Sequence, residues 1–466
     1  MTMNYYEIPD LERWAEHIEE LAQHLGLFCS PQEFEISDQA QMLGYMAYSG
    51  LPSHYPHWSY GKAYERLKTM YDYGVTGLPY EMVINSNPCL AYLMRDNSLL
   101  MKVLTIAHVY GHNDFFKNNF TFRHTRAELA IDLFKVHANR IRSYIEDPTI
   151  GIDRVEAVLD SAHAISLQCR RNQTVVKPEA GRERETQGLG ESDEDLLLFL
   201  RDNNRRLSEW EQDLLTIVDE ETRYFIPQME TTIMNEGWAS YWHKQILDSL
   251  DLSLEQRMEF MVKHAQVLAP HPNGINPYHL GFFVWSALRI WYDGCVDREL
   301  LRRDELSWFD RMQTDFEERT SLPPESGKKT GREVLFQVRE TDRDASFLRR
   351  FLTPAVMREL DLFQHESQKS ASNGQVRAVT KTSSPEQWRD VKETLVRSVG
   401  VGSLPVIKVE NSSDGGNSTL LLRHYHDGRD LELGSAEKTL AHVRRLWSSP
   451  VVLETRLEGK PIRLEA

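Results

Sequence analysis

The stretch of sequence that most constrains the fold reads Ile106-Ala107-His108-Val109-Tyr110-Gly111-His112-Asn113-Asp114. It belongs to the longer segment Leu99–Phe116, which is apolar nearly all round in a helical projection, so we expect a buried helix. His108 and His112 stand at positions i and i+4, which project from one face of a helix one turn apart. Two imidazoles at this spacing can bind one metal ion, whereas the alternative is a pair of core histidines bonded to carbonyl groups.

Gly111, between the two histidines, carries a separate prediction. A glycine inside a helix lowers helix stability by about 1 kcal/mol relative to alanine. Its presence here predicts that another backbone packs closely against this turn.

The motif departs from the zinc peptidase pattern His-Glu-x-x-His. In that pattern the residue after the first histidine is the glutamate that acts as general base, and here Val109 takes that place. A hydrolase built on this helix therefore needs a carboxylate from another segment.

The segment Met234–His243 is the best source of a further ligand. Glu236, Ser240 and His243 stand at i, i+4 and i+7, forming a polar stripe on a helix of mainly apolar and aromatic residues. A buried carboxylate requires a cation, a metal or several donors, so we expect Glu236 to be the third ligand beside His108 and His112. The alternative partner for Glu236 is an arginine.

Several other residues are candidates for supporting roles. Glu81 heads an apolar run and is a candidate general base, together with His243, although it can equally be a solvated strand end. Asp160 and His163, close together on one predicted helix, can orient a ligand imidazole or form a surface pair. Two further supporting candidates are Asn235, beside Glu236, and His279, where a loop enters an apolar helix.

Length and composition indicate a globular protein of more than one domain. The chain has 466 residues, and single cores stop growing at roughly 250–300 residues. The net charge of −16 argues against nucleic acid as a partner. The four cysteines are scattered without a CxxC pair, which favours a reducing compartment, and neither a signal peptide nor a transmembrane segment is predicted. We expect a cytoplasmic protein.

The hydrophobic pattern predicts a mainly α N-terminal domain over residues 1–325 and a small α+β domain over 326–466. Seven segments show helical periodicity: Leu11–Leu25, Leu99–Phe116, Arg126–Ile145, Val155–Cys169, Glu194–Phe225, Thr231–Leu250 and Pro277–Trp291. Residues 176–194 are almost devoid of apolar side chains and predict a surface loop.

A proline- and charge-rich stretch, Ser321–Lys329, marks the expected boundary between these domains. Beyond it we predict helices at Pro385–Ser398 and Ala436–Trp447 and strands at Glu333–Arg339, Gln375–Thr380, Pro405–Val409, Thr419–His424 and Val451–Arg456. This region has no phosphate-binding loop or nucleophile elbow, so we assign it to binding or assembly.

Four motifs together resemble the stage V sporulation protein R (SpoVR) family. They are Asn85-Ser86-Asn87-Pro88, His108–Asn119, Met234–His243 and Pro277-Tyr278-His279-Leu280-Gly281, and the resemblance covers nearly the whole chain. It implies a bacterial protein of the mother-cell cytoplasm that takes part in forming the spore cortex, a peptidoglycan layer. Relatives also occur in bacteria that do not sporulate.

The resemblance does not supply a reaction, so the chemistry rests on the metal-binding pattern. The Glu-Gly-Trp-Ala run at Glu236 is also similar to the segment that supplies the glutamate ligand in some zincin-like peptidases. We therefore expect a zincin-like site binding zinc or another divalent ion and hydrolysing an amide or peptide bond, with peptidoglycan precursors or cortex-synthesis proteins as partners.

Two other hypotheses remain open. One is a non-catalytic assembly or regulatory factor for cortex synthesis, which Val109 favours. The other is a carboxylate-bridged di-iron protein, which needs Glu-x-x-His pairs on two helices and finds no such glutamate on the histidine helix.

Overall fold

The computed structural model describes residues 8–73, 81–169, 195–271, 274–317, 329–362, 365–369, 376–381, 388–411 and 419–466. The chain forms two compact units, each assembled from three stretches of sequence. The first unit comprises Met1–Gly50, Leu67–Leu129 and Gln228–Gly400, and the second comprises Leu51–Arg66, Ala130–Pro227 and Val401–Ala466. Helices predominate, and a small sheet lies near the C-terminus, as the sequence predicted.

The first unit is a helical bundle with a three-stranded sheet, whose strands lie within residues 32–94. Its helices are α1 (Ile8–His24), α2 (Gln39–Ala47), α4 (Leu99–Asn118), α9 (Thr232–Ser249), α10 (Leu254–Val267), α11 (Pro277–Val296), α12 (Arg303–Glu317), α13 (Gly331–Thr341), α14 (Asp344–Phe351), α15 (Pro354–Glu359) and α16 (Trp388–Ser398). The sheet has the order β1 (Gln32–Ser37), β3 (Cys89–Met94), β2 (Glu81–Ile84). A separate hairpin joins β4 (His365–Lys369) to β5 (Val376–Lys381).

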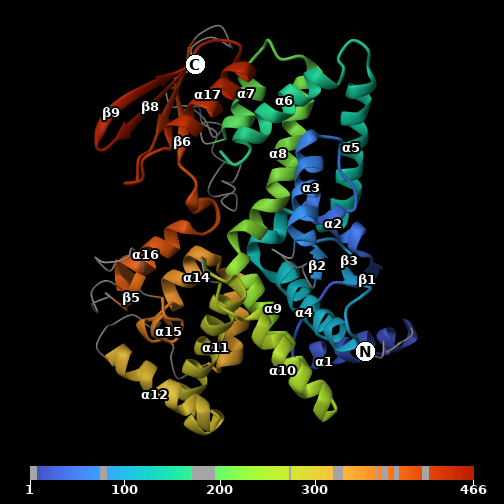
Figure 1. The fold of residues 1–466 in the computed structure, drawn as a ribbon, viewed down its shortest axis with the longest axis vertical. Helices are drawn as coiled ribbons and strands as arrows, with labels where there is room; N and C mark the ends of the chain where they lie inside the picture. Colours follow the sequence, from blue (N-terminus) through green and yellow to red (C-terminus); the bar gives the residue numbers. More distant parts are fainter. Residues whose placement is uncertain are drawn as a thin grey trace, which may run out of the picture. The chain divides into compact units, whose positions relative to one another are not determined.

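Helix α4 lies at the centre of this unit. Ser98 caps its first turn by accepting a hydrogen bond from the backbone N–H of Met101, and every residue from Val103 to Phe116 is buried. Helices α1 and α9 pack along α4, and α11 packs against α9 (Figure 1). The prediction of a buried histidine helix is confirmed.

Glycines allow the central helices to approach closely. A Cβ atom on Gly111 would lie 2.6 Å from the Cα of Ala239 on α9, so the predicted close backbone contact at this turn is confirmed. Gly237 of α9 and Gly281 of α11 face each other in the same way, with no room for a Cβ on either. The polar residues on α4 and α9 are therefore held on two helices whose backbones touch.

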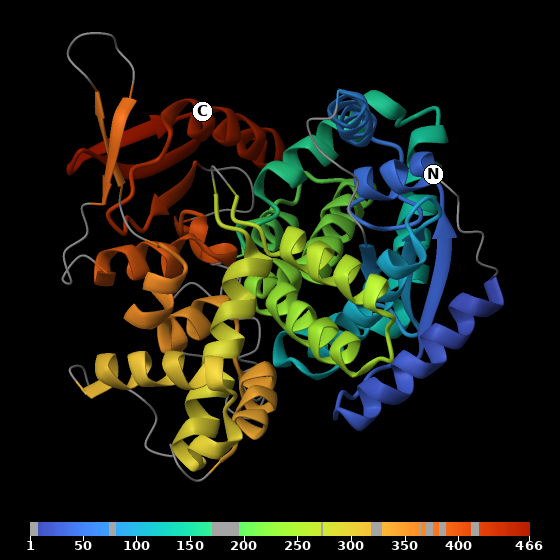
Figure 2. The same cartoon turned by 60° about the horizontal axis from the view of Figure 1, so that its bottom comes forward.

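The second unit combines helices with a four-stranded sheet. The helices that belong wholly or largely to it are α5 (Ala130–Glu146), α6 (Ile152–Ile165), α7 (Leu196–Asn203), α8 (Glu209–Glu230) and α17 (Leu433–Trp447). The sheet has the order β6 (Ile407–Asn411), β7 (Leu420–His424), β8 (Val451–Leu457), β9 (Lys460–Glu465), and only the β7–β8 pair is parallel. Helix α17 connects β7 to β8 and lies along one face of the sheet (Figure 2). Helix α3 (Trp58–Asp72) begins in this unit and ends in the first.

One predicted strand is wrong. Glu333–Arg339 lies within helix α13, which begins with a capping box between Thr330 and Glu333. Val334, Leu335 and Val338 are buried at helical spacing, a pattern that a short apolar run does not distinguish from a strand. Strands β1 and β3 of the first sheet were not predicted, and β2 was considered only as the strand end at Glu81.

The predicted boundary at residue 325 and the predicted surface loop at 176–194 both lie outside the described residues. The division into residues 1–325 and 326–466 stays a prediction. Within the described part of the chain, no helix is both long and apolar enough to span a bilayer.

Candidate metal centre

The centre is built by three elements of the first unit. Helix α4 supplies His108 and His112, α9 supplies Glu236, and Glu81 is the first residue of β2. Strand β2 pairs antiparallel with β3, the strand that precedes α4 in the chain, so Glu81 stands opposite Leu93. A strand and two touching helices thus bring together residues as far apart in sequence as Glu81 and Glu236.

The four side chains converge through nitrogen and oxygen atoms. His108 Nε2 lies 3.0 Å from Glu81 Oε1 and 3.8 Å from Glu236 Oε2. His112 Nε2 lies 3.6 Å from Glu81 Oε1 and 3.5 Å from Glu236 Oε2. One ligand atom from each residue can be chosen so that all four lie within 4.8 Å of one another. Among the described residues, this is the only such group of three or more potential ligands.

These separations fit a metal ion. Four ligands about 2.0–2.1 Å from a tetrahedral zinc ion are separated from each other by about 3.3 Å, within the range of the four contacts. Two imidazoles and two carboxylates are also a donor set used by zinc and by other divalent first-row metals. The residues present therefore suit a divalent ion.

Unsatisfied oxygens point to the same conclusion. Within the described chain, the buried atoms Glu81 Oε2 and Glu236 Oε2 have no hydrogen-bond partner. Buried carboxylate oxygens without donors are costly, and a cation between them removes that cost. The side chain of Glu236 is 20% exposed and that of Glu81 is 8% exposed, so the centre is most accessible beside Glu236.

The charges of the carboxylates and the imidazoles stabilise one another even without a metal. Burial disfavours the Glu81 carboxylate, but the adjacent His108 and His112 outweigh burial and hold the pKa of Glu81 at about 2. Burial likewise disfavours the imidazolium form of His112, yet Glu236 and Glu81 outweigh it and raise the pKa of His112 to about 9. The carboxylates of Glu81 and Glu236 thus attract positive charge, which a proton on His112 or a divalent ion can supply.

The rear nitrogens of both histidines are held in place. His112 Nδ1 lies 2.9 Å from Asn235 Oδ1, so Nδ1 donates to Asn235, and loss of the proton on Nε2 lets that nitrogen present its lone pair to an ion at the centre. His108 Nδ1 lies 2.8 Å from His243 Nδ1, and His243 Nε2 lies 2.7 Å from His264 Nδ1. Asn235 and His243 therefore stand behind the two candidate ligands, and His243 contacts His108 on the side away from Glu81.

Tyr278 is a residue that the sequence argument missed. It lies in the first turn of α11, and its hydroxyl is 3.4 Å from Glu81 Oε1. Burial and the neighbouring Glu236 and Glu81 raise the pKa of Tyr278 well above its ordinary value, so the phenol stays protonated and can donate. The signal was its position next to His279 in the Pro277–Gly281 motif. The ring of His279 packs against Phe283 instead.

Asp160 and His163 are not gathered at this centre. Both lie on α6 of the second unit, where Asp160 accepts a hydrogen bond of 2.8 Å from Trp58 Nε1 and His163 Nε2 contacts the Tyr55 hydroxyl at 2.7 Å. Asp160 also lies 3.4 Å from His57 Nε2. Their partners are thus residues of their own unit.

A polar pocket of about 270 Å³ lies at the C-terminal half of α4. It is lined by the Asn85-Ser86-Asn87 run and by Phe116, whose ring stacks on that of His112 with centroids 5.9 Å apart. The charged side chains lining it are Lys117, Arg123, Arg126 and Glu128, an excess of positive charge. Such a pocket favours an anionic group.

Comparison with known proteins identifies the class to which this fold and site belong. The family model described as "SpoVR like protein" matches residues 5–191 and 173–404, and the model described as "SpoVR-like C-terminal domain" matches residues 405–458. The chain belongs to the SpoVR family, which makes it a sporulation-related protein by family.

One curated relative is similar to this chain over nearly its whole length. The chain is 31% identical over 500 aligned positions to the "Uncharacterized protein YcgB" of Escherichia coli (strain K12), covering 97% of this chain and 93% of the relative. No solved structure matches the chain.

Proposed function

We propose that this protein is a metal-dependent hydrolase of amide or peptide bonds. The observation that carries the proposal is the buried cluster of His108, His112, Glu236 and Glu81, with ligand atoms within 4.8 Å and carboxylate oxygens that lack donors within the described chain. A structural salt bridge needs one carboxylate and one cation, whereas two carboxylates and two imidazoles around one point match a metal site.

In this proposal His108, His112 and Glu236 hold the ion, which is zinc or another divalent metal. A divalent ion in such a site supplies Lewis-acid chemistry, because it polarises a carbonyl group and makes water more acidic. The remaining tasks fall to the chain's own side chains.

Glu81 takes the part that glutamate plays in His-Glu-x-x-His peptidases, although it comes from a strand. Its carboxylate faces the same space as both histidines, so it can accept a proton there. The phenol of Tyr278, close to Glu81 and with its proton retained, is placed to donate a hydrogen bond to an oxygen that gains negative charge. Asn235 and His243 orient the ligand histidines from behind.

The substrate class follows from charge and family. The basic pocket lined by Asn85–Asn87 lies beside the C-terminal half of α4, the helix that also carries His108 and His112. Its positive charge suits an anionic group, such as a carboxylate of a peptidoglycan precursor. Within the family's link to sporulation, we propose a role in spore cortex formation, in the mother-cell cytoplasm, with cortex-synthesis proteins as partners. Residues 1–325 would form the zincin-like catalytic part.

The experiment separates the two glutamates. Metal affinity is measured by chelator competition, and hydrolysis by release of new amino groups from peptidoglycan precursor peptides. Glu236→Gln should weaken metal binding by more than about a hundredfold, because a ligand carboxylate is lost. Glu81→Gln should keep the metal and abolish hydrolysis. Glu255→Gln, an exposed position on α10, is the matched control and should change neither.

The alternative is a non-catalytic assembly or regulatory factor, which Val109 favours because the helix lacks the usual glutamate. In that case metal binding persists and no precursor is hydrolysed by the native protein. Metal binding unaffected by Glu236→Gln would instead remove Glu236 from the ligands.

A further inference from the structure

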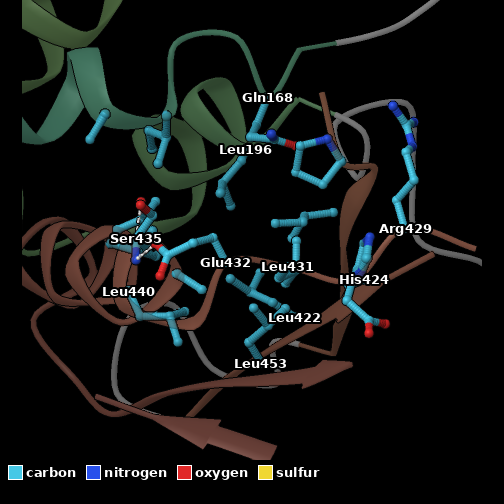
Figure 3. Close-up of a pocket in the computed structure, with 18 of the residues that line it drawn as sticks. Gln168, Leu196, Leu422, His424, Arg429, Leu431, Glu432, Ser435, Leu440 and Leu453 are labelled. Atoms are coloured by element: carbon cyan, nitrogen blue, oxygen red, sulfur yellow. Dashed lines mark hydrogen bonds between the residues drawn. The ribbon is translucent and has the colours of Figure 1, made fainter. Parts of the chain in front are cut away.

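A cavity lined by both apolar and charged side chains lies in the second unit, which contains none of the candidate metal ligands. Its volume is about 390 Å³, near the lower end of the roughly 300–1,000 Å³ typical of small-molecule sites. Figure 3 shows its walls: the sheet, the first turns of α17, the segment that joins β7 to α17, and the end of α6 with Leu196. All of these belong to the same unit.

His424, the last residue of β7, lines the cavity at the carboxyl end of that strand. Strand β7 alternates, with Leu420, Leu422 and His424 buried and Arg423 exposed. His424 therefore continues the apolar face on which Leu420 and Leu422 lie. A histidine on that face, at the carboxyl end of the strand, is a polar group where packing alone would favour an apolar one.

The neighbouring strand supplies a polar partner for His424. Thr455 of β8 is 5% exposed, as is His424, and its Oγ1 lies 2.8 Å from His424 Nδ1. In the tautomer that carries its ring proton on Nδ1, His424 donates this hydrogen bond to the Thr455 hydroxyl. The other nitrogen, Nε2, is then an acceptor with no hydrogen-bond partner among the described residues. Its natural partner is an N–H or O–H donor.

The floor of the cavity is apolar. Leu422 and Leu453 come from the sheet, and Leu440 comes from α17 (Figure 3). All three are at most 3% exposed, although they line the cavity. An aliphatic chain bound there would be removed from water, and this favours binding in proportion to the apolar area that is buried.

The charged rim disfavours anions. The lining of the cavity contains three acidic side chains, those of Asp427, Asp430 and Glu432, and one basic side chain, that of Arg429. Arg429 is already paired with Asp427 and also donates to the carbonyls of Gly402 and Ser403.

The first N–H groups of α17, which would otherwise attract an anion, are taken as well. Glu432 accepts hydrogen bonds from the backbone N–H groups of Gly434 and Ser435 at 3.0 and 2.6 Å. The rim therefore carries excess negative charge and its anion-binding donors are occupied.

We propose that this cavity binds an aliphatic amine, with its hydrocarbon chain on the leucine floor and its ammonium group between His424 and the acidic rim. The amine is either a free small molecule, such as a diamine or basic amino acid, or the lysine side chain of a peptide. The proposal concerns the second unit alone and does not depend on the metal centre.

The test uses the full chain and three probes that share a six-carbon body: n-hexylamine, 1-hexanol and hexanoate. Binding is measured by ligand-observed NMR titration. The amine should bind most tightly, the alcohol more weakly and hexanoate least, and added salt should weaken only the amine. Nα-acetyl-lysine amide, compared with lysine, distinguishes a peptide side chain from a free amino acid. Saturable binding of hexanoate as tight as that of hexylamine, or no saturable binding of the amine, would overturn the proposal.

Two variants locate the binding. Asp427→Asn removes an acid and frees Arg429, so hexylamine should bind about fivefold more weakly while hexanoate gains affinity. The matched control is Asp202→Asn, which breaks an exposed Asp–Arg pair with Arg201 elsewhere in the unit and should leave both affinities unchanged. Ala436→Phe, which fills the cavity from α17, should abolish binding of all three probes. Unchanged hexylamine affinity in folded Asp427→Asn would contradict the proposed place of the ammonium group.

Discussion

Replacing Gly111 by alanine tests whether the contact between α4 and α9 sets the geometry of the metal centre. The new Cβ would lie 2.6 Å from Ala239 Cα and 3.2 Å from Ala239 Cβ, so one of the helices must move. Gly111 is next to His112, and Ala239 is three residues after Glu236. A shift of either helix therefore widens the 3.5 Å separation between His112 Nε2 and Glu236 Oε2.

Two opposing contributions decide the magnitude. Alanine in place of glycine favours the helix by about 1 kcal/mol, while overpacking of a tight core costs about 1–3 kcal/mol. Because the clash is with backbone atoms, we expect the upper end of that cost and a net loss of about 2 kcal/mol. Gly44→Ala, in helix α2 of the same unit, meets no atom within 4 Å and should gain up to about 1 kcal/mol.

The assay is urea unfolding in the presence of a chelator, followed by metal titration of the refolded protein. We expect Gly111→Ala to be about 3 kcal/mol less stable than Gly44→Ala and to bind metal at least about tenfold more weakly, with every ligand intact. If Gly111→Ala matches Gly44→Ala in stability and metal affinity, the helix contact does not position the ligands.

Three further predictions follow from individual contacts. Asn235→Ala should weaken metal binding by about 10–100-fold, measured by chelator competition, because His112 loses the acceptor that orients its ring. Arg339→Met should destabilise the protein by about 3–5 kcal/mol in urea unfolding, since it leaves the buried Asp114 carboxylate without its cation, and adding Asp114→Asn should restore part of the loss. Burial lowers the pKa of His163 to about 4, so its contribution to stability is complete above pH 6.5 and is lost as the pH falls toward 4. His163→Gln should reduce the drop in urea midpoint between pH 7 and pH 5, and an equal drop in both proteins would refute this assignment.

The parts of the site that the sequence predicted are those determined by helical spacing. His108 and His112 share a face because they are four residues apart, and Glu236 stood out as an acidic residue on an apolar helix. Gly111 indicated a close backbone, and Ala239 provides it. These inferences needed only local geometry.

The rest depended on contacts between distant segments. From the sequence, Glu81 could be either a general base or a solvated strand end. Only the pairing of β2 with β3 places its carboxylate next to His108. Tyr278 carries no spacing signal, because only the start of α11 brings its hydroxyl to Glu81. Asp160 and His163 share the helical geometry of a ligand pair, yet their helix belongs to the other unit.

The fold shows the same division between local and distant information. The apolar residues of Glu333–Arg339 fit the spacing of a helix and also that of a strand. The capping box at Thr330 favours the helix. No local pattern indicates that three separated stretches combine into each unit. Such assembly is a property of the packed cores.

The metal content of the purified native protein decides whether His108, His112, Glu236 and Glu81 form a metal site. Protein prepared without chelator is analysed by elemental analysis beside the His108→Ala/His112→Ala double variant. We expect about one equivalent of a divalent transition metal in the native protein and its loss in the variant. Less than about a tenth of an equivalent in the native protein, or equal content in both, would contradict it.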